Sequence, residues 1–258
     1  MPSSQAPATP SAQAAAPTPA EAAAPPRHVV VTGAAGGVGR ALVALLEAQG
    51  DTVTGLDLPD HDVTDAAAIA ATVRALDARQ PIDALVHAAG VLHADAAVTP
   101  DPQGLSHSLQ VNVGGVVNVC SVVAELMIAR GRGAIVVVSS NAATTPRMGM
   151  ASYCASKAAA TAWTRVLALE CAGHGVRCNI VSPGSTDTPM LRGMWPEGTD
   201  QSARVIAGSP EEFRLGIPDA TLGSPEDIAA ACAFLISPAA RHITMHDLRV
   251  DGGATLDS

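Results

Sequence analysis

The sequence predicts one α/β domain in which a doubly wound parallel sheet carries helices on both faces. Short apolar runs rich in β-branched residues, such as 135–138 and 176–181, are typical of strands buried on both sides. Longer segments with helical periodicity, such as 105–130, separate these runs. This alternation favours parallel strands joined by helices, and a glycine-rich turn directly after the first apolar run fits the same architecture.

The first 26 residues differ in composition from the rest of the chain. They are almost entirely Ala, Pro, Ser, Thr and Gln, so we expect a disordered tail over 1–26. This tail lacks the basic start and the continuous apolar core of a secretory signal. Residues 27–258 are enough for one domain with a sizeable core, and no stretch is expected to approach the length and apolarity of a membrane span.

Charge and cysteine content restrict the class of protein. With 15 basic and 24 acidic side chains the net charge is −9, which speaks against nucleic-acid binding and for a soluble protein. The five cysteines are odd in number and lack Cys-x-x-Cys spacing, which favours a reduced, cytoplasmic location. His242 and His246 have i, i+4 spacing, but a strand signal at 248–250 opposes a metal pair, so no metal site is expected.

The glycine-rich turn predicts a dinucleotide site. An apolar run at 29–31 leads into Thr-Gly-Ala-Ala-Gly-Gly-Val-Gly and then into a helical stretch at 40–49. Glycines let the backbone approach a pyrophosphate at the helix N-terminus, where free N–H groups favour anions. This strand, turn and helix together predict a Rossmann fold. The expected loop contacts are Gly33, Gly36, Gly37, Val38 and Gly39.

An acidic residue after the next strand-like run indicates which nicotinamide cofactor is used. Asp57 follows the run 52–56 and lies eighteen residues beyond Gly39. A carboxylate there accepts hydrogen bonds from the adenosine ribose and repels a 2′-phosphate, which predicts NAD rather than NADP. Gly36 offers no cation that could bind such a phosphate. Asp62 and Val63 are expected beside the adenine ring.

The only tyrosine and the only lysine of the chain, Tyr153 and Lys157, are four residues apart. On a helix they share a face. An ammonium about 4 Å from the phenol, at an effective dielectric of about 20, supplies about 4 kcal/mol, or roughly three pKa units. Ser140, after the run 135–138, would hold a substrate oxygen together with the phenol. We therefore predict that Tyr153 is a general base whose pKa is lowered by Lys157.

These motifs at this spacing resemble the short-chain dehydrogenase/reductase superfamily over residues 28–256. The resemblance implies that Asn112 is the asparagine that carries a proton-relay water. With Ser140, Tyr153 and Lys157 it would complete a catalytic tetrad. The further cofactor contacts that the resemblance implies are Ala89, Gly90, Tyr153, Lys157, Pro183, Gly184, Thr186 and Thr188.

One position departs from the family's pattern. His87 begins His-Ala-Ala-Gly, where many members have an asparagine. Ala89 and Gly90 still permit a close approach of the cofactor, but the family's usual hydrogen bonds at this point do not carry over.

Further segments are similar to the 2,3-dihydro-2,3-dihydroxybenzoate dehydrogenases of catechol siderophore biosynthesis. They are 145–150, 175–188, 213–218, 242–244 and 250–256. The resemblance implies NAD-dependent oxidation of the C3 hydroxyl, followed by aromatisation to 2,3-dihydroxybenzoate.

A substrate of this kind carries a carboxylate, for which arginine is the natural partner in a partly closed site. Arg147, shortly before Tyr153, and Arg192, in the variable segment after Pro183-Gly184, are the candidates. Met150 is expected to form an apolar wall, and Ser140 to contact the oxygen that reacts.

The sequence also leaves two alternative functions open and predicts an oligomeric state. The same chemistry would serve a 2-amino analogue, a dihydro-3-hydroxyanthranilate, in antibiotic biosynthesis. A nucleotide-sensing Rossmann module without catalysis is a reading of a different class, although such modules commonly lose the tyrosine or the lysine. Because the superfamily commonly forms tetramers, the resemblance implies a homotetramer built through 105–130, 151–173 and 248–250.

Overall fold

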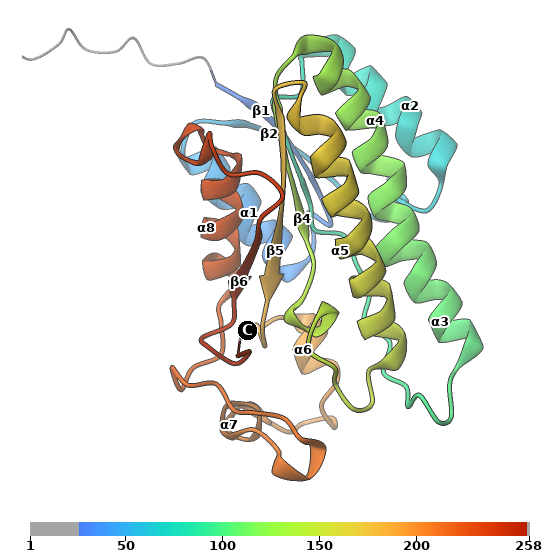
Figure 1. Ribbon diagram of the computed structural model, residues 1–258, viewed down its shortest axis with the longest axis vertical. Helices are drawn as coiled ribbons and strands as arrows, with labels where there is room; N and C mark the ends of the chain where they lie inside the picture. Colours follow the sequence, from blue (N-terminus) through green and yellow to red (C-terminus); the bar gives the residue numbers. More distant parts are fainter. Residues whose placement is uncertain (1–25, 257–258) are drawn as a thin grey trace, which may run out of the picture.

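The computed structural model describes residues 26–256, which form three layers with a parallel sheet in the middle (Figure 1). The predicted tail, 1–26, lies outside the described residues except for Pro26. The strand order β2-β1-β3-β4-β5-β6 reverses direction between β1 and β3, so the predicted doubly wound sheet is confirmed. The strands are β1 (His28–Thr32), β2 (Thr52–Leu56), β3 (Ala84–His87), β4 (Gly133–Val138), β5 (Val176–Pro183) and β6 (Asp247–Val250).

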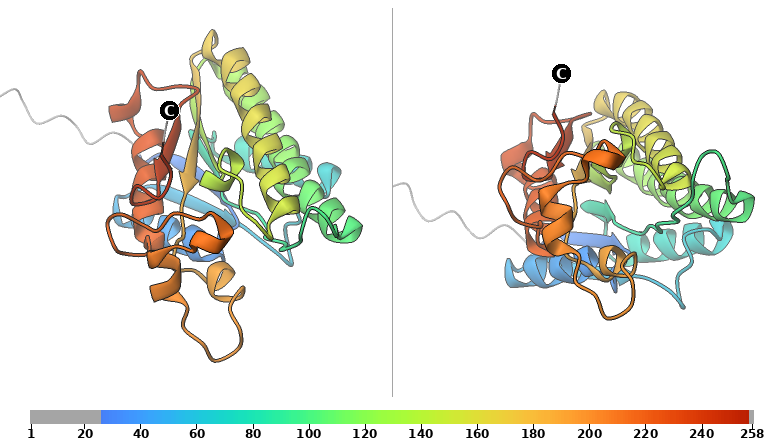
Figure 2. Two further views of the ribbon diagram at one scale, coloured as in Figure 1. Left: turned by 60° about the horizontal axis from the view of Figure 1, so that its bottom comes forward. Right: turned by 90° about the horizontal axis from the view of Figure 1, so that it is seen from below.

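Helices cover both faces of the sheet. In Figure 1, α2, α4 and α5 lie on one side and α1 and α8 on the other, while α6 and α7 lie beyond the carboxyl ends of the strands. Figure 2 shows the segment around α6 and α7 projecting from this end of the molecule. The helices are α1 (Gly37–Ala48), α2 (Ala66–Arg79), α3 (Pro102–Leu109), α4 (Gly115–Arg130), α5 (Ala151–Ala172), α6 (Pro189–Arg192), α7 (Ser202–Ala207) and α8 (Pro225–Ile236).

The core has two halves, one on each side of the sheet. Val29 and Val31 of β1 point toward α1 and α8, whereas Val30 points toward the layer of α4 and α5. Since successive strand residues alternate between faces, a strand covered on both sides must be apolar throughout. All three valines are fully buried, which explains why the first strand is a continuous apolar run.

The predicted long helix over 105–130 is interrupted. Helix α3 ends at Leu109, and a single π-helical turn over Gln110–Gly114 joins it to α4. Such π turns accommodate one extra residue and are frequent at functional sites. Asn112 lies in the middle of this turn.

The expectation that no stretch resembles a membrane span is wrong for this part of the chain. Among the described residues, Pro102–Arg130 has the length and the mean hydropathy, 1.8, of a span. The α4 residues Val116, Val119 and Val123 are buried in the core beneath α2 and α5. A core helix can have the same composition as a span, and 44% of the most apolar window of this helix is buried inside the fold.

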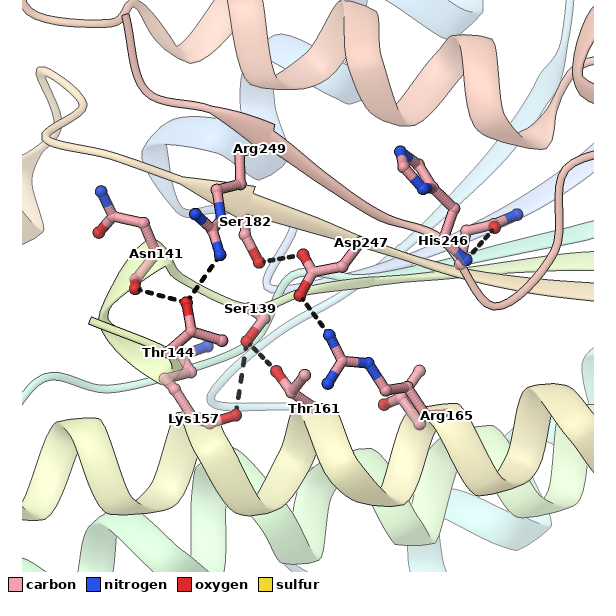
Figure 3. Close-up of polar contacts among 12 residues, drawn as sticks. Ser139, Asn141, Thr144, Lys157, Thr161, Arg165, Ser182, His246, Asp247 and Arg249 are labelled. Carbon is pink, nitrogen blue, oxygen red and sulfur yellow. Dashed lines mark hydrogen bonds and ion pairs between the residues drawn. The ribbon is translucent and has the colours of Figure 1, made fainter. Parts of the chain in front are cut away.

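Polar contacts fasten α5 to the carboxyl half of the sheet (Figure 3). Asp247 of β6 accepts hydrogen bonds from Ser182 Oγ (2.5 Å) and from Arg165 Nη2 of α5 (3.1 Å). Nearer the N-terminus of α5, the hydroxyls of Ser139 and Thr161 are 2.6 Å apart. The helix that carries Tyr153 and Lys157 is thus fixed to the sheet at two polar points.

Asp247→Ala is expected to lower the free energy of unfolding by about 1–3 kcal/mol, because Ser182 and Arg165 lose a shielded charged acceptor. The matched control is Glu125→Ala, which removes the acid of the exposed Arg74–Glu125 pair and should cost about 0–1 kcal/mol. Urea unfolding of both variants provides the comparison, and equal losses would contradict a role for Asp247 in fastening α5.

Candidate active site

One large pocket, of about 860 Å³, opens at the carboxyl ends of the strands. Parallel sheets bind ligands at this edge, where the strand order reverses. All residues predicted from the sequence to contact the cofactor line the pocket, from the glycine loop to Thr188. Ser140, Arg147 and Met150 line the same pocket, whereas Asn112 and Arg192 do not.

The glycine loop is built for a close approach of backbone to ligand. Gly33 has a φ of +68°, and a Cβ there would lie 2.6 Å from the backbone nitrogen of Ala89. A Cβ on Gly37 would lie 2.9 Å from Thr188 Cγ2 on the opposite wall. Gly33 therefore allows the loop to pack directly on the backbone after β3, and Gly37 leaves room for Thr188 at the N-terminus of α1. This cradle fits a pyrophosphate.

Asp57 is held at the end of β2 by two backbone groups. Its carboxylate accepts hydrogen bonds from Ala35 N (2.7 Å) and Leu58 N (2.8 Å). The carboxylate therefore lies beside the glycine loop, where an adenosine ribose would pass. Arg40, which directly follows Gly39, also lines the pocket. Sequence reasoning missed this cation, although its place at the start of the helix after the glycines was a signal.

Tyr153 and Lys157 come together as their spacing predicts. Both side chains are buried, and Lys157 Nζ lies 5.9 Å from the centre of the Tyr153 ring. Lys157 Nζ donates a hydrogen bond to Val138 O at the end of β4 (3.1 Å). Ser140 lies two residues beyond that strand end, and its Oγ accepts a hydrogen bond from Ala142 N (3.1 Å). A phenol, a hydroxyl and an ammonium thus meet at one end of the pocket.

The predicted lowering of the Tyr153 pKa by Lys157 is not what the structure shows. Burial raises the pKa of Tyr153, and the hydrogen bond with Ser140 opposes this rise only in part. Burial also lowers the pKa of Lys157 to about 8. The simple estimate from the Tyr–Lys separation omitted desolvation, which disfavours the charged form of each group and here dominates.

Asn112 positions other elements rather than facing the pocket. Its Oδ1 accepts from Val91 N (2.8 Å), and its Nδ2 donates to Val91 O (2.9 Å) and to Ser156 Oγ (2.9 Å). The side chain therefore links the segment after β3 to α5. A Cβ on Gly90 would lie 3.1 Å from Asn112 Oδ1 and 3.2 Å from Lys157 Nζ, so glycine is what allows this close packing.

His87 takes part in the sheet rather than in the pocket. It is fully buried, and its Nδ1 lies 3.0 Å from Thr32 Oγ1 of β1. Burial, with a smaller contribution from the charge of Lys157, lowers the pKa of His87 to about 3. The imidazole is therefore neutral, and it joins the ends of β1 and β3 beneath the cofactor cradle.

Of the two arginines that are candidates for substrate binding, Arg147 lines the pocket and Arg192 does not. Arg147 is half-buried in the pocket wall beside Met150. Arg192 is half-exposed, forms a two-pronged ion pair with Asp187 (2.5 and 2.8 Å) and lies 5.3 Å above the Trp195 ring. Arg214 lines the pocket instead of Arg192. It lies in a segment that carried the resemblance, but its direction depends on the tertiary fold.

Comparisons with known proteins identify the family of this chain. A family model described as enoyl-(acyl carrier protein) reductase matches residues 28–255. The 2,3-dihydro-2,3-dihydroxybenzoate dehydrogenase of Bacillus subtilis is 42% identical over 248 residues, which cover 88% of this chain and 95% of that protein. The chain belongs to the short-chain dehydrogenase/reductase family.

Two further members of the family illustrate its range. The vibriobactin-specific 2,3-dihydro-2,3-dihydroxybenzoate dehydrogenase of Vibrio cholerae is 48% identical over 175 residues, which cover 68% of this chain and 66% of that protein. Among solved structures, the ligand-free aldohexose dehydrogenase of Thermoplasma acidophilum superposes with a TM-score of 0.80 at 28% identity, covering 89% of this chain and 94% of that one. The chain is therefore an oxidoreductase of this family with its fold intact.

The burial of Lys157 predicts a pH dependence of stability. Its pKa falls from 10.5 to about 8 on folding, so the unfolded chain binds more protons between these values. Below pH 8 the folded protein carries the whole burial penalty, which decreases as pH rises toward 10.5. As pH rises from 8 toward 10.5, the free energy of unfolding of wild type should therefore increase relative to that of Lys157→Met, by roughly 1 kcal/mol per pH unit.

Urea unfolding at pH 7.5, 8.5 and 9.5 measures this difference. The comparison with Lys157→Met cancels the contributions of every ionisable group that the two proteins share. A difference that stays constant over the three pH values would contradict the burial of a charged lysine.

Proposed function

We propose that this enzyme oxidises 2,3-dihydro-2,3-dihydroxybenzoate to 2,3-dihydroxybenzoate with NAD, in siderophore biosynthesis. The observation that carries the proposal is one pocket in which the Ser140 and Tyr153 hydroxyls face the same space as the half-buried Arg147 guanidinium. A hydroxylated carboxylic acid fits these groups. Two of the relatives described above bear the name of this dehydrogenase.

The residues present fit a nicotinamide dinucleotide. The cradle at Gly33, Gly37 and Gly39 would hold the pyrophosphate, and Lys157 the nicotinamide ribose. Asp57 would accept hydrogen bonds from the adenosine ribose, which favours NAD over NADP. When bound, a nicotinamide would supply the acceptor for the hydride from the substrate's C3.

The chain's own residues would handle the oxygen and its proton. Ser140 and Tyr153 would hold the C3 hydroxyl between them, and Tyr153 Oη would accept its proton. A phenol whose pKa is raised by burial needs added positive charge to act near neutral pH. The charge of Lys157 does not offset this rise in the protein alone, so an oxidised nicotinamide would supply the further positive charge. The dienone that results would tautomerise to the aromatic catechol.

Substrate orientation would come from the other end of the pocket. Arg147 would bind the carboxylate, since guanidinium groups match its two oxygens. Met150, on the wall beside Arg147, would contact the ring. The same groups would also accept a 2-amino analogue, so only the substituent at C2 separates these two substrates. A nucleotide sensor would not need the buried Tyr153 and Lys157.

Assembly and compartment remain predictions. Val166 and Leu169 are exposed apolar residues on α5, as a homotetramer built through that helix would require. The free cysteines Cys120, Cys154, Cys171, Cys178 and Cys232 suit a reducing cytoplasm.

The direct test is the appearance of NADH absorbance when purified protein is mixed with NAD and the dihydrodiol. Rapid reduction of NAD together with catechol fluorescence is the expected result, with a much slower reaction for NADP. Preference for the 2-amino compound would move the enzyme to antibiotic biosynthesis. Silence with both substrates would overturn the proposal.

Tyr153→Phe is expected to lower kcat by more than about 10³-fold while leaving the affinity for NAD nearly unchanged, because only the proton acceptor is lost. Lys157→Ala should impair both turnover and NAD affinity, because Lys157 would also bind the ribose. Steady-state kinetics and NAD titration by tryptophan fluorescence distinguish the two variants. Substantial turnover by Tyr153→Phe would show that another group is the base.

A further inference from the structure

A second guanidinium faces the pocket from a different part of the chain. Arg214 lies between α7 and α8, whereas Arg147 lies in the loop before α5, and both line the pocket. The Arg214 backbone pairs with Ser209 in both directions, through Ser209 N to Arg214 O (2.9 Å) and Arg214 N to Ser209 O (3.0 Å). Arg214 Nη2 donates a hydrogen bond to Ser185 Oγ, just after β5 (2.8 Å). Arg214 is thus anchored at both its backbone and its side chain.

The two cations carry a burial penalty that the surrounding protein does not offset. Burial lowers the pKa of both arginines, and the charge of Arg214 lowers that of Arg147 further. The charge of Asp251 raises the pKa of Arg147 from a distance. The charge of Glu212 likewise raises the pKa of Arg214, whereas the charge of Arg204 lowers it.

No carboxylate within residues 26–256 forms an ion pair with Arg147 or Arg214. Glu212 pairs with Arg204 instead (3.1 Å), and Asp251 accepts a hydrogen bond from Asn141 Nδ2 (3.1 Å). Two half-buried like charges with no acid in contact are unfavourable unless an anion joins them.

We propose that Arg214 and Arg147 together bind one carboxylate, which makes Arg214 a specificity-determining residue of this pocket. A carboxylate has two oxygens and about four acceptor sites, so it accommodates a guanidinium on each side. The inference rests on the proposed function for the identity of the acid, a carboxylated cyclohexadiene diol.

Two-point attachment explains how such a substrate would be aligned. The carboxylate would be held between Arg147 and Arg214, and the reacting hydroxyl between Ser140 and Tyr153. Fixing both ends of a rigid six-membered ring orients the C–H bond that must break. A diol without the carboxylate would be held at one end only. Binding of the acid would also connect the 208–216 loop to the loop before α5.

The test compares Arg214→Gln, Arg147→Gln and the double variant with Arg204→Gln as the matched control. Arg204 belongs to the same segment and carries the same charge, but it is exposed and does not line the pocket. Each protein is assayed with the dihydrodiol carboxylate, with the diol that lacks the carboxylate, and for its KM for NAD.

Arg214→Gln should lower kcat/KM for the carboxylated substrate about 10- to 100-fold, as expected for one lost charge-assisted hydrogen bond. Its effect on the diol without the carboxylate and on the KM for NAD should be under about twofold, as for Arg204→Gln throughout. The two single losses should be non-additive in the double variant, because both arginines would bind one group. Equal losses with both diols would overturn the inference.

A second experiment measures the binding of 2,3-dihydroxybenzoate through the shift that it causes in the melting temperature. It distinguishes a failure of this inference from a failure of the proposed function. Without ligand, Arg214→Gln should melt no lower than wild type, because the repulsion between the two positive charges is relieved. With ligand, its shift in melting temperature should be smaller than that of wild type. If wild type binds the acid through both arginines but does not oxidise the dihydrodiol, the proposed function fails and the inference stands. If wild type oxidises the dihydrodiol and Arg214→Gln does so equally well, the inference alone fails.

Discussion

The arrangement of the active site depends on one buried ammonium group, that of Lys157. The charge is almost wholly removed from water, and its Nζ makes one hydrogen bond, to Val138 O at the end of β4. Holding it there requires α5 to lie close to the strand ends. Gly90 permits this approach because it has no side chain, and Asn112 secures it by joining the segment after β3 to Ser156 of α5. Asn112 itself lies in the π turn that interrupts the long helix.

A common physical pattern links Lys157 with the arginine pair at the other end of the pocket. All three cations are at least half-buried, and no ion pair within residues 26–256 compensates them. Outside the pocket, Asp247 is paired with Arg165, whereas the half-buried Arg177 donates hydrogen bonds to the backbone carbonyls of Leu235 and Ser237. Uncompensated burial of charge lowers stability but strengthens the interaction with a ligand of opposite or delocalised charge, because little water must be displaced.

Local pattern was enough to predict most of the fold and part of the site. The runs 135–138 and 176–181 appear as strands, and the glycines after 29–31 form the predicted turn, since both signals depend on neighbouring residues alone. Tyr153 and Lys157 could be paired because helical spacing determines their face. By contrast, the sequence alone does not show whether Arg192 or Arg214 lines the pocket. The packing of the loops decides this: Arg192 pairs with Asp187, and Arg214 lines the pocket. The pKa of Tyr153 was misjudged for a related reason, because burial is a property of the whole fold.

Ionisation of Tyr153 with and without NAD tests the central claim most directly, and the chain offers an unusual advantage because it contains no other tyrosine. Phenolate absorbance near 295 nm therefore reports this residue alone. The account predicts a titration midpoint above the ordinary value of about 10 in the protein by itself, since burial raises the pKa. Saturating NAD should lower the midpoint substantially toward neutrality, and Lys157→Met should weaken that shift. A midpoint that is the same with and without NAD would contradict the assignment of Tyr153 as a base activated by the charges assembled around it.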